Sequence, residues 1–354
     1  MNKYQIVELG ENNNHAGTKA PADIMSIAEK MGYMPLTVAL DFKDSSFFGK
    51  VKRQVHYMND YKRIFQTVAP GSLVFMQHPY HHKQVTRTSV IRKLKSKKAV
   101  KYISIVHDVE ELREYRYNNY YKHEFSVMLE VADVIIVHNQ KMLEWFASNG
   151  YPKTRMVSLD IFDYIQDNSY KHPIFDRSIT VAGNLDVQKS RYISELKNLS
   201  GVDIHLYGPN FDQSMTECSL IHYHGSFPSS EIPSKLTKGF GLVWDGESIT
   251  QCNGPSGEYL KYNNPHKLSL YLSSGLPVVI WKEAAEADFV KNNNLGVCVG
   301  SLYELEQLFN QINIEQYEEM ANNVERIRKN LISGYYANAA LSQAEEILSK
   351  DITE

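Results

Sequence analysis

The sequence is poor in cysteine: Cys218, Cys252 and Cys298 are scattered through a chain of 354 residues. An odd number of separated cysteines argues against a disulfide framework and a Cys-x-x-Cys metal site, and it is typical of a reducing compartment. No apolar run approaches the roughly 18 residues of a membrane span. Residues 1–9 lack the apolar core of a signal peptide. We therefore expect a cytoplasmic location.

A strong charge of one sign and several short enzyme motifs are also missing. The net charge is only −3, so we expect no nucleic-acid partner. No Asp-x-Asp pair occurs, which leaves the usual metal-dependent way of holding a nucleotide diphosphate unsupported, and we expect no metal. No Gly-x-Ser-x-Gly elbow occurs either, which argues against an α/β-hydrolase.

Short apolar strands alternate with helical patterns along the whole chain, a rhythm typical of doubly wound parallel sheets. Hydrophobic residues make up 43% and charged residues 22%, as in an ordinary globular protein. The rhythm pauses over residues 160–176, which we take as the interdomain connection. We predict an α/β protein with Rossmann-like domains at 1–162 and 163–332, and a return helix within 333–354 that packs on the first domain.

The predicted elements follow from the local hydrophobic period. Strands are expected at 4–9, 36–40, 73–77, 102–107, 134–137, 156–159, 178–182, 203–207, 220–223, 240–244, 278–281 and 296–299. Helices are expected near 20–31, 48–68, 84–97, 119–131, 140–149, 188–198, 231–237, 265–273, 284–292, 302–311, 315–330 and 335–350.

Ligands of open α/β sheets bind beyond the carboxyl ends of the strands, so the loops there are candidate sites. After the first strand, Gly17 frees the backbone and Thr18 can cap a helix, in a loop that suits a phosphate, a sugar or only solvent. His107 and Asp108 end the fourth strand. They could supply a general base, or Asp108 could cap the next turn while His107 packs against it.

Histidines and basic residues suggest two further features of the first half. His78, His81 and His82 have a spacing that permits a metal site, but no cysteine or acidic cluster completes it. We favour the alternatives, which are a contact with an acceptor substrate or a loop without a binding role. The basic stretch at 87–101 could touch anionic lipid, although a solvated helix face is the simpler interpretation.

In the second half, polar residues follow successive strands. Gly183 opens one such loop, and Lys189 within it could reach a phosphate or remain solvated. Tyr207 ends another strand, where its ring could stack on a nucleobase. Asp245 ends a third, where it could accept hydrogen bonds from hydroxyl groups. We expect these positions to converge on one site.

Residues 259–281 are the most informative segment. Asn264 resembles an N-cap and Pro265 a first helical residue, while Gly275 ends the helix. Lys267 then lies in the first turn, where a cation is disfavoured by the helix dipole unless an anion sits beside it. The segment therefore suits a diphosphate, or else is an ordinary capped helix with an exposed lysine.

Five segments resemble those of one bacterial family, which includes glucosyltransferase 3 of serine-rich adhesin glycosylation and the β-1,6-galactofuranosyltransferases. The run Asn-Asn-Pro-His-Lys at 263–267 is the most specific of them. The matching segments are 15–23, 104–113, 241–246, 262–267 and 271–277.

This resemblance implies a GT-B fold, two Rossmann-like domains facing a cleft, with the UDP-sugar donor held by the second and the acceptor by the first. It implies metal-independent transfer without a cofactor, because the UDP-sugar is a substrate. Lys267 and Lys189 would then neutralise the diphosphate. The implied donor contacts are Gly17, Thr18, Gly183, Lys189, Tyr207, Asp245, Asn263, Asn264 and Lys267, and the implied acceptor contacts are Gln77, His78 and Arg113.

The expected function is transfer of a hexose, glucose or N-acetylglucosamine, to a sugar on a glycoprotein such as a serine-rich adhesin. A galactofuranosyltransferase of cell-surface polysaccharide synthesis is the first alternative, and a non-catalytic partner subunit that binds a nucleotide or glycan is the second. By the same resemblance we expect a homo-oligomer. Eight residues after Glu258 stands His266, whereas many retaining GT-B enzymes have a second glutamate there. We therefore expect inversion, with Asp108 or His107 as the base.

Overall fold

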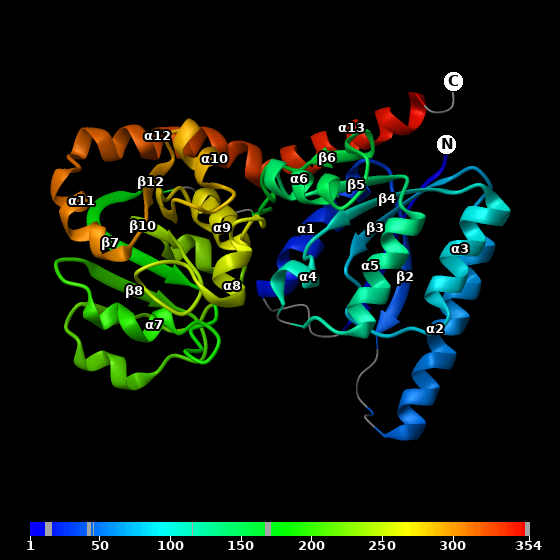
Figure 1. Cartoon of the computed structure of the whole chain (residues 1–354), viewed down its shortest axis with the longest axis horizontal. Coiled ribbons are helices and arrows are strands. Elements are labelled where there is room, and N and C mark those ends of the chain that lie inside the picture. The colour runs from blue at the N-terminus through cyan, green and yellow to red at the C-terminus, as the bar shows by residue number, and fades with distance from the viewer. Residues whose placement is uncertain (11–15, 41–43, 45, 115, 167–170, 351–354) are drawn as a thin grey trace.

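The computed structural model describes residues 1–10, 16–40, 44, 46–114, 116–166 and 171–350, with the side chains of residues 16–18 left out. Two lobes lie side by side, each built on one six-stranded parallel sheet (Figure 1). The α/β prediction is confirmed, since every strand pairing in both sheets is parallel.

The first sheet has the strand order β2-β1-β3-β4-β5-β6, so the direction of winding reverses between β1 and β3. Its strands are β1 (Lys3–Gly10), β2 (Met34–Leu40), β3 (Leu73–His78), β4 (Lys101–Val106), β5 (Val134–Val137) and β6 (Met156–Ser158). The helices of this lobe are α1 (Ala16–Lys30), α2 (Phe47–Thr67), α3 (Arg87–Lys98), α4 (Glu110–Arg113), α5 (Asn119–Val131) and α6 (Gln140–Ser148).

Alternation along β3 places residues on both faces of this sheet, as expected for a strand buried on two sides. Leu73 and Phe75 join a core cluster with α1. Val74 and Met76 join a different cluster with α2 and α3. The continuous apolar run that predicted the strand is therefore explained by helices on both faces.

The second sheet has the order β12-β11-β10-β7-β8-β9, with its reversal between β7 and β10. Its strands are β7 (Ile174–Ala182), β8 (Asp203–Tyr207), β9 (Ile221–Tyr223), β10 (Lys238–Val243), β11 (Val278–Trp281) and β12 (Gly296–Val299). The α-helices of this lobe are α7 (Tyr192–Glu195), α8 (Gly254–Tyr259), α9 (His266–Ser274), α10 (Ala287–Asn292), α11 (Leu305–Gln311) and α12 (Ile314–Ser333).

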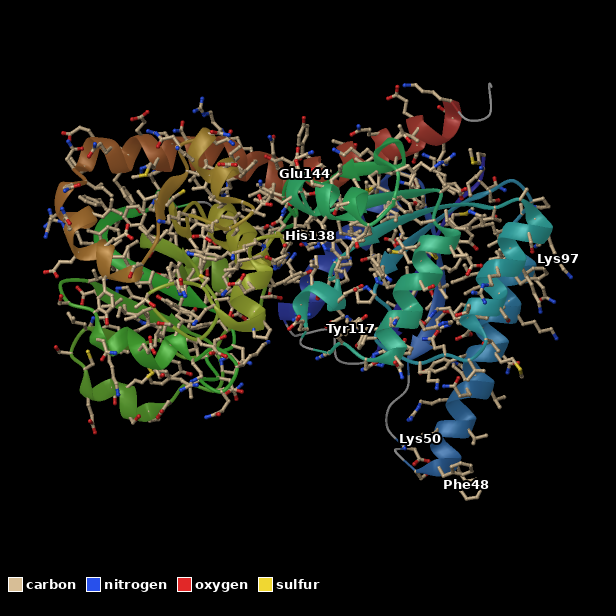
Figure 2. The ribbon with its side chains drawn as sticks, in the orientation of Figure 1. Phe48, Lys50, Lys97, Tyr117, His138 and Glu144 are labelled. Atoms are coloured by element: carbon tan, nitrogen blue, oxygen red, sulfur yellow. The ribbon has the colours of Figure 1, made fainter. Side chains whose placement is uncertain are left out.

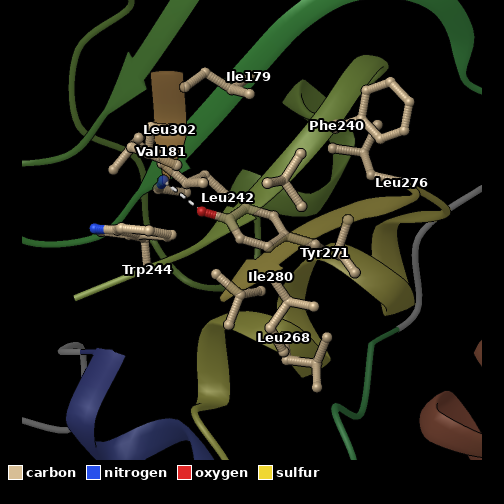
Figure 3. Close-up of a cluster of buried hydrophobic side chains, with 14 of the residues drawn as sticks. Ile179, Val181, Phe240, Leu242, Trp244, Leu268, Tyr271, Leu276, Ile280 and Leu302 are labelled. Carbon is tan, nitrogen blue, oxygen red and sulfur yellow. Dashed lines mark hydrogen bonds between the residues drawn. The ribbon is translucent and has the colours of Figure 1, made fainter. Parts of the chain in front are cut away.

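Helix α9 is buried on nearly every side, from Leu268 to Ser274. Figure 3 shows Tyr271 among the apolar side chains of this lobe, with its hydroxyl accepting a hydrogen bond from the Ala182 amide at 2.9 Å. A Cβ on Gly241 would lie 2.1 Å from the Tyr271 ring, so the strand needs glycine there. This packing fixes the start of α9 relative to the carboxyl end of β10.

The last helix, α13 (Tyr335–Lys350), runs from the second lobe onto the first (Figure 1). Its buried residues, Ala337, Ala340, Leu341, Ala344 and Leu348, belong to the same core cluster as Ile103 and Ile136 of the first sheet. The Asp163 carboxylate accepts from the amides of Tyr336 and Ala337 at 3.2 and 2.7 Å. That contact satisfies two of the amides that a helix start leaves unpaired.

Two predicted helices are wrong in kind or length. Residues 188–198 form only the short α7 and a 3-10 turn at Leu196–Asn198, and residues 231–237 form a 3-10 helix at Ile232–Lys235. Pro233 removes one backbone donor in the latter segment. Neither stretch is long enough to gain much from cooperative helix formation.

Candidate functional site

The loops after β7 and β8 touch each other. The Gly183 amide donates to the Tyr207 carbonyl at 2.9 Å. A Cβ on Gly208 would lie 1.7 Å from the Gly183 carbonyl oxygen, so only glycine permits this approach. The Tyr207 ring stacks on His224 at 4.5 Å and also contacts Phe227 at 6.3 Å.

The loop after β10 brings Asp245 beside Lys267 at the start of α9. Lys267 Nζ donates to the Trp244 carbonyl at 2.8 Å and lies 3.7 Å from Asp245 Oδ2. The other carboxylate oxygen of Asp245 accepts from Ser190 Oγ at 3.2 Å and from the Gly246 amide at 2.9 Å. The ammonium is therefore held at a strand end rather than in solvent, with 24% of the side chain exposed.

The expected N-cap of α9 is wrong. Pro265 occupies the cap position, without a side-chain cap bond, and the helix begins at His266. Asn264 instead faces the first lobe: its amide donates to His138 Nδ1 at 2.9 Å, and its Nδ2 donates to the Asp160 carbonyl at 3.2 Å. Tertiary contacts have replaced the local cap.

Three buried polar atoms in this segment have no hydrogen-bond partner within the described part of the chain. They are Asn263 Oδ1, Asn264 Oδ1 and His266 Nε2. Buried polar side-chain atoms are normally paired, because an unmade hydrogen bond costs about 1–3 kcal/mol. Two acceptors and an imidazole nitrogen, one turn from a lysine, suit a ligand that combines hydroxyl groups with negative charge.

His107 is held by Gln77 at the carboxyl end of β4. Gln77 Nε2 donates to the Pro21 carbonyl at 3.2 Å, which directs Gln77 Oε1 at His107 Nε2, 2.7 Å away. His107 Nε2 must therefore carry the proton, and the lone pair of the neutral ring is on Nδ1. Burial, together with His138 and His266, lowers the His107 pKa to about 3.

Asp108 has a different environment from its neighbour. Its carboxylate pairs with Arg113 at 2.7 Å, and 26% of its side chain is exposed. Burial raises the Asp108 pKa to about 6, against the lowering effect of Arg113. Asp108 is not the cap of α4, because Val109 holds that position. The two candidate general bases, His107 and Asp108, therefore have separate hydrogen-bond partners and do not form one hydrogen-bonded unit.

Not every predicted site residue lies with the side chains around Lys267 and Asp108. His78 is 5% exposed and lines an internal cavity with Arg87 and Glu124. Lys189 is exposed on the loop after β7. Gly17 contributes backbone to α1, whereas the Thr18 side chain lies outside the described residues.

The basic stretch at 87–101 is a solvated face only in part, because Arg87 is buried and paired with Glu124. Among the described residues, no cluster of three histidine, cysteine or acidic side chains could hold a metal ion. None of the described helices is long and apolar enough to cross a bilayer.

Sequence reasoning missed the residues that join the two lobes near Asn264 and Asp108. Asn139 Nδ2 donates to Glu286 Oε1 at 2.8 Å, and the Tyr259 hydroxyl accepts from the Val109 amide at 3.0 Å. His138 and Asn139 directly follow β5. Applying the strand-end argument to that strand as well would have found both.

Comparison with known proteins shows that this chain is similar to sugar-transferring enzymes. The family description "Glucosyltransferase 3-like, N-terminal domain" matches residues 3–161, and its C-terminal counterpart matches 179–344. "Beta-1,6-galactofuranosyltransferase WbbI" of Escherichia coli (strain K12) is 34% identical over 68% of this chain and 70% of its own length. "Glucosyltransferase 3" of Streptococcus gordonii is 25% identical over 98% of this chain and 100% of its own.

Solved structures give the fold. Anabaena HepE in complex with UDP-glucose aligns with a TM-score of 0.59 at 14% identity, over 98% of this chain and 99% of that one. The lipopolysaccharide outer core galactosyltransferase WaaB aligns with a TM-score of 0.58 at 12% identity, over 98% and 99%. With the two parallel sheets, these likenesses confirm the GT-B fold.

Proposed function

Because this chain belongs to the glucosyltransferase 3-like family, we propose that it transfers a hexose, glucose or N-acetylglucosamine, from a UDP-sugar to a sugar acceptor. The acceptor we propose is a sugar on a glycoprotein such as a serine-rich adhesin. The reaction is metal-independent and takes place in the cytoplasm. The donor binds to residues 163–332, the acceptor to residues 1–162, and 333–354 is the return segment.

The observation that carries this proposal is Lys267 with the unpaired polar atoms beside it. A diphosphate placed against Lys267 would replace Asp245 as its main counter-charge, and the amide oxygens of Asn263 and Asn264 would accept from sugar hydroxyls. Charge on a leaving diphosphate grows in the transition state. A cation fixed beforehand by the Trp244 carbonyl therefore lowers the barrier without a metal.

The transfer step we propose is a single displacement. Asp108 or His107 removes the proton of the acceptor hydroxyl while that oxygen attacks the anomeric carbon. The bond from the anomeric carbon to the diphosphate breaks, and its electron pair leaves with UDP. Attack from the face opposite the leaving group inverts the configuration. Lys267, with Lys189 as a second cation, neutralises the product.

A galactofuranosyltransferase is the second candidate. The 34% identity to a β-1,6-galactofuranosyltransferase favours it, since the compared glucosyltransferase 3 is 25% identical. The two candidates share the fold, the diphosphate contact and the base. They differ in the donor sugar, and in that the acceptor belongs to a cell-surface polysaccharide rather than a glycoprotein. The protein would be a homo-oligomer in either case, which sedimentation velocity tests.

A donor screen separates these candidates. UDP-glucose, UDP-N-acetylglucosamine and UDP-galactofuranose are each incubated with an N-acetylglucosamine-bearing peptide or a simple glycoside, and products are detected by mass spectrometry. We expect product only with donor and acceptor together, undiminished by EDTA. Product formed from UDP-galactofuranose and acceptor, and from neither of the other two donors, would establish the second candidate. UDP binding without turnover under every combination would instead indicate a non-catalytic partner subunit.

A further inference from the structure

Helix α2 has two apolar faces, and the described residues of the chain cover one of them. The inner face packs into the first lobe through Tyr57, Tyr61 and Ile64, all buried. A second stripe is formed by Phe48, Val51, Val55 and Met58, which are 82%, 48%, 47% and 48% exposed. Spacings of three and four residues place these four side chains on one side of the helix, turned away from the core. We call them the outer stripe.

The outer stripe lies where α2 projects from the molecule. Figure 2 shows Phe48 and Lys50 at the tip of this helix, beyond the rest of the lobe. Phe47, 75% exposed, packs its ring edge-to-face against Phe48 at 5.9 Å. Two adjacent phenylalanines that are exposed at a projecting tip are unusual, because apolar patches on a protein surface commonly mark contacts with a partner.

The charge around the outer stripe is mostly positive, although the exposed Asp44 lies beside Gly49 in the first turn of α2. Helix α2 carries five basic residues, and its single acidic residue, Asp60, is buried and paired with Arg63. Helix α3, which packs beside α2, contains no acidic residue. This concentration occurs in a chain whose net charge is −3. The exposed basic residues of α2 that border the stripe are Lys50, Lys52, Lys62 and Arg63.

We propose that the outer stripe docks on the surface of an anionic lipid bilayer. Phe47 and Phe48 enter the boundary between headgroups and acyl chains, and the lysines contact lipid phosphates. Helices with one apolar and one basic face bind bilayers in this way. A second copy of the chain is disfavoured as the partner, because a symmetric contact would bring two positive helices together. The basic stretch at 87–101 adds charge but offers no comparable apolar face.

Vesicle binding by the full chain tests this proposal independently of turnover. Co-sedimentation is measured with vesicles of phosphatidylcholine alone and of phosphatidylcholine with one third phosphatidylglycerol. We expect binding to the anionic vesicles that weakens with added salt. The double variant Phe48→Ser/Val55→Ser should lose at least ~5-fold of the bound fraction, since both side chains lie in the apolar stripe. Lys52→Gln/Lys62→Gln should reduce binding and its salt dependence.

Matched variants control for general effects. Ile174→Ser removes an apolar side chain that is 68% exposed, between the values for Phe48 and Val55, from the second lobe. Lys122→Gln/Lys141→Gln removes two exposed charges from other helices of the first lobe. Both should bind vesicles as the wild type does, and thermal unfolding confirms that every variant is folded.

Two results would overturn the proposal. One is unchanged vesicle binding by Phe48→Ser/Val55→Ser. The other is an oligomer, seen by sedimentation velocity without lipid, that this variant dissociates while the wild type binds no vesicles; the outer stripe would then be a contact between copies. A failed donor screen would leave the vesicle result unaffected, so the two proposals fail separately.

Discussion

At the scale of single residues, the ammonium of Lys267 is placed by oxygens of the protein before any ligand arrives. The Trp244 carbonyl holds it at 2.8 Å, and the Asp245 carboxylate lies 3.7 Å away. A group positioned in advance needs little reorganisation when charge develops on a leaving diphosphate. The same residue would sit poorly at a helix start without an anion, which is why the sequence already drew attention to it.

Replacing this lysine tests the diphosphate contact. We expect Lys267→Ala to lower kcat by roughly 10²–10³-fold, the usual effect of removing one preorganised donor to a developing negative charge, and to weaken UDP binding. Steady-state kinetics and calorimetric UDP titration measure the two effects. The control is Lys261→Ala, which removes a half-buried lysine paired with Glu258 at 2.7 Å in the same segment. Equal activity of both variants would remove Lys267 from the mechanism.

The pH dependence distinguishes the two candidate bases. A base must be unprotonated, and its pKa serves best near the working pH. The Asp108 pKa, raised to about 6 by burial, meets this condition better than the His107 pKa, lowered to about 3. We therefore expect kcat/KM to fall as the pH decreases through about 6, because Asp108 then takes up a proton.

Variants of both residues complete that test. Asp108→Asn should abolish the acidic limb along with most activity, whereas His107→Gln should keep the limb. A pH profile that stays flat from 7 down to 5 in the wild type would point to His107 instead. Circular dichroism over the same range separates loss of the base from loss of the fold.

At the scale of elements, the site depends on two loops that approach more closely than side chains permit. Gly208 has φ +147° and leaves no room for a Cβ beside the Gly183 carbonyl. The Gly183 amide in turn donates to the Tyr207 carbonyl. These contacts hold the carboxyl ends of β7 and β8 together next to the reversal point of the second sheet.

Gly208→Ala should therefore damage the site more than an ordinary glycine substitution. We expect it to lower the free energy of unfolding by more than ~2 kcal/mol, from backbone strain plus the clash, and to weaken UDP binding. The comparison is Gly150→Ala, with φ +90° but open space around its Cβ, for which only the strain of about 1–2 kcal/mol applies. Urea unfolding and calorimetry supply the values. Equal losses in both variants would refute the role of the close approach.

The strands were predictable because most of them are short apolar runs bounded by polar residues. Such runs are typical of strands in a parallel sheet that helices cover on both faces. The short helices were not predictable. Residues 188–198 carry a weak helical period that backbone turns around Asp186 and Ser190 override. The cap of α9 was mispredicted because Asn264 bonds His138 of the other lobe, 126 residues away, and no local pattern records that contact.

At the scale of the whole molecule, the two lobes are joined by buried polar contacts as well as by α13. Glu286 is 1% exposed and accepts from Asn139 of the first lobe. Burial raises the Glu286 pKa to about 8. The folded state thus binds this proton more tightly than the unfolded state does. The associated stability is complete below the unfolded pKa and is lost as the pH rises through about 8.

Glu286→Gln should therefore make the protein less sensitive to alkaline pH. The amide keeps an acceptor for Asn139 and carries no charge to bury. We expect the wild-type Tm to fall between pH 6 and pH 9 and the variant's Tm to fall by at least ~2 °C less, since 1 kcal/mol corresponds to about 2–4 °C in proteins of moderate size. Glu144→Gln, at an exposed position, is the control. Parallel curves for wild type and Glu286→Gln would contradict the buried-charge argument.

Hydrophobic period and strand-end position are local properties, so the α/β class and the two parallel sheets could be predicted from the sequence, and residues 263–267 could be singled out as a candidate site. Which polar groups meet, in contrast, depends on the packing of the whole chain. Lys267 lies beside Asp245, His107 bonds Gln77, and Asp108 pairs with Arg113. His78 lines an internal cavity. The outer stripe of α2 is also exposed among the residues that the structure describes. These outcomes depend on contacts between residues far apart in the chain, and a local pattern carries no information about its distant partners.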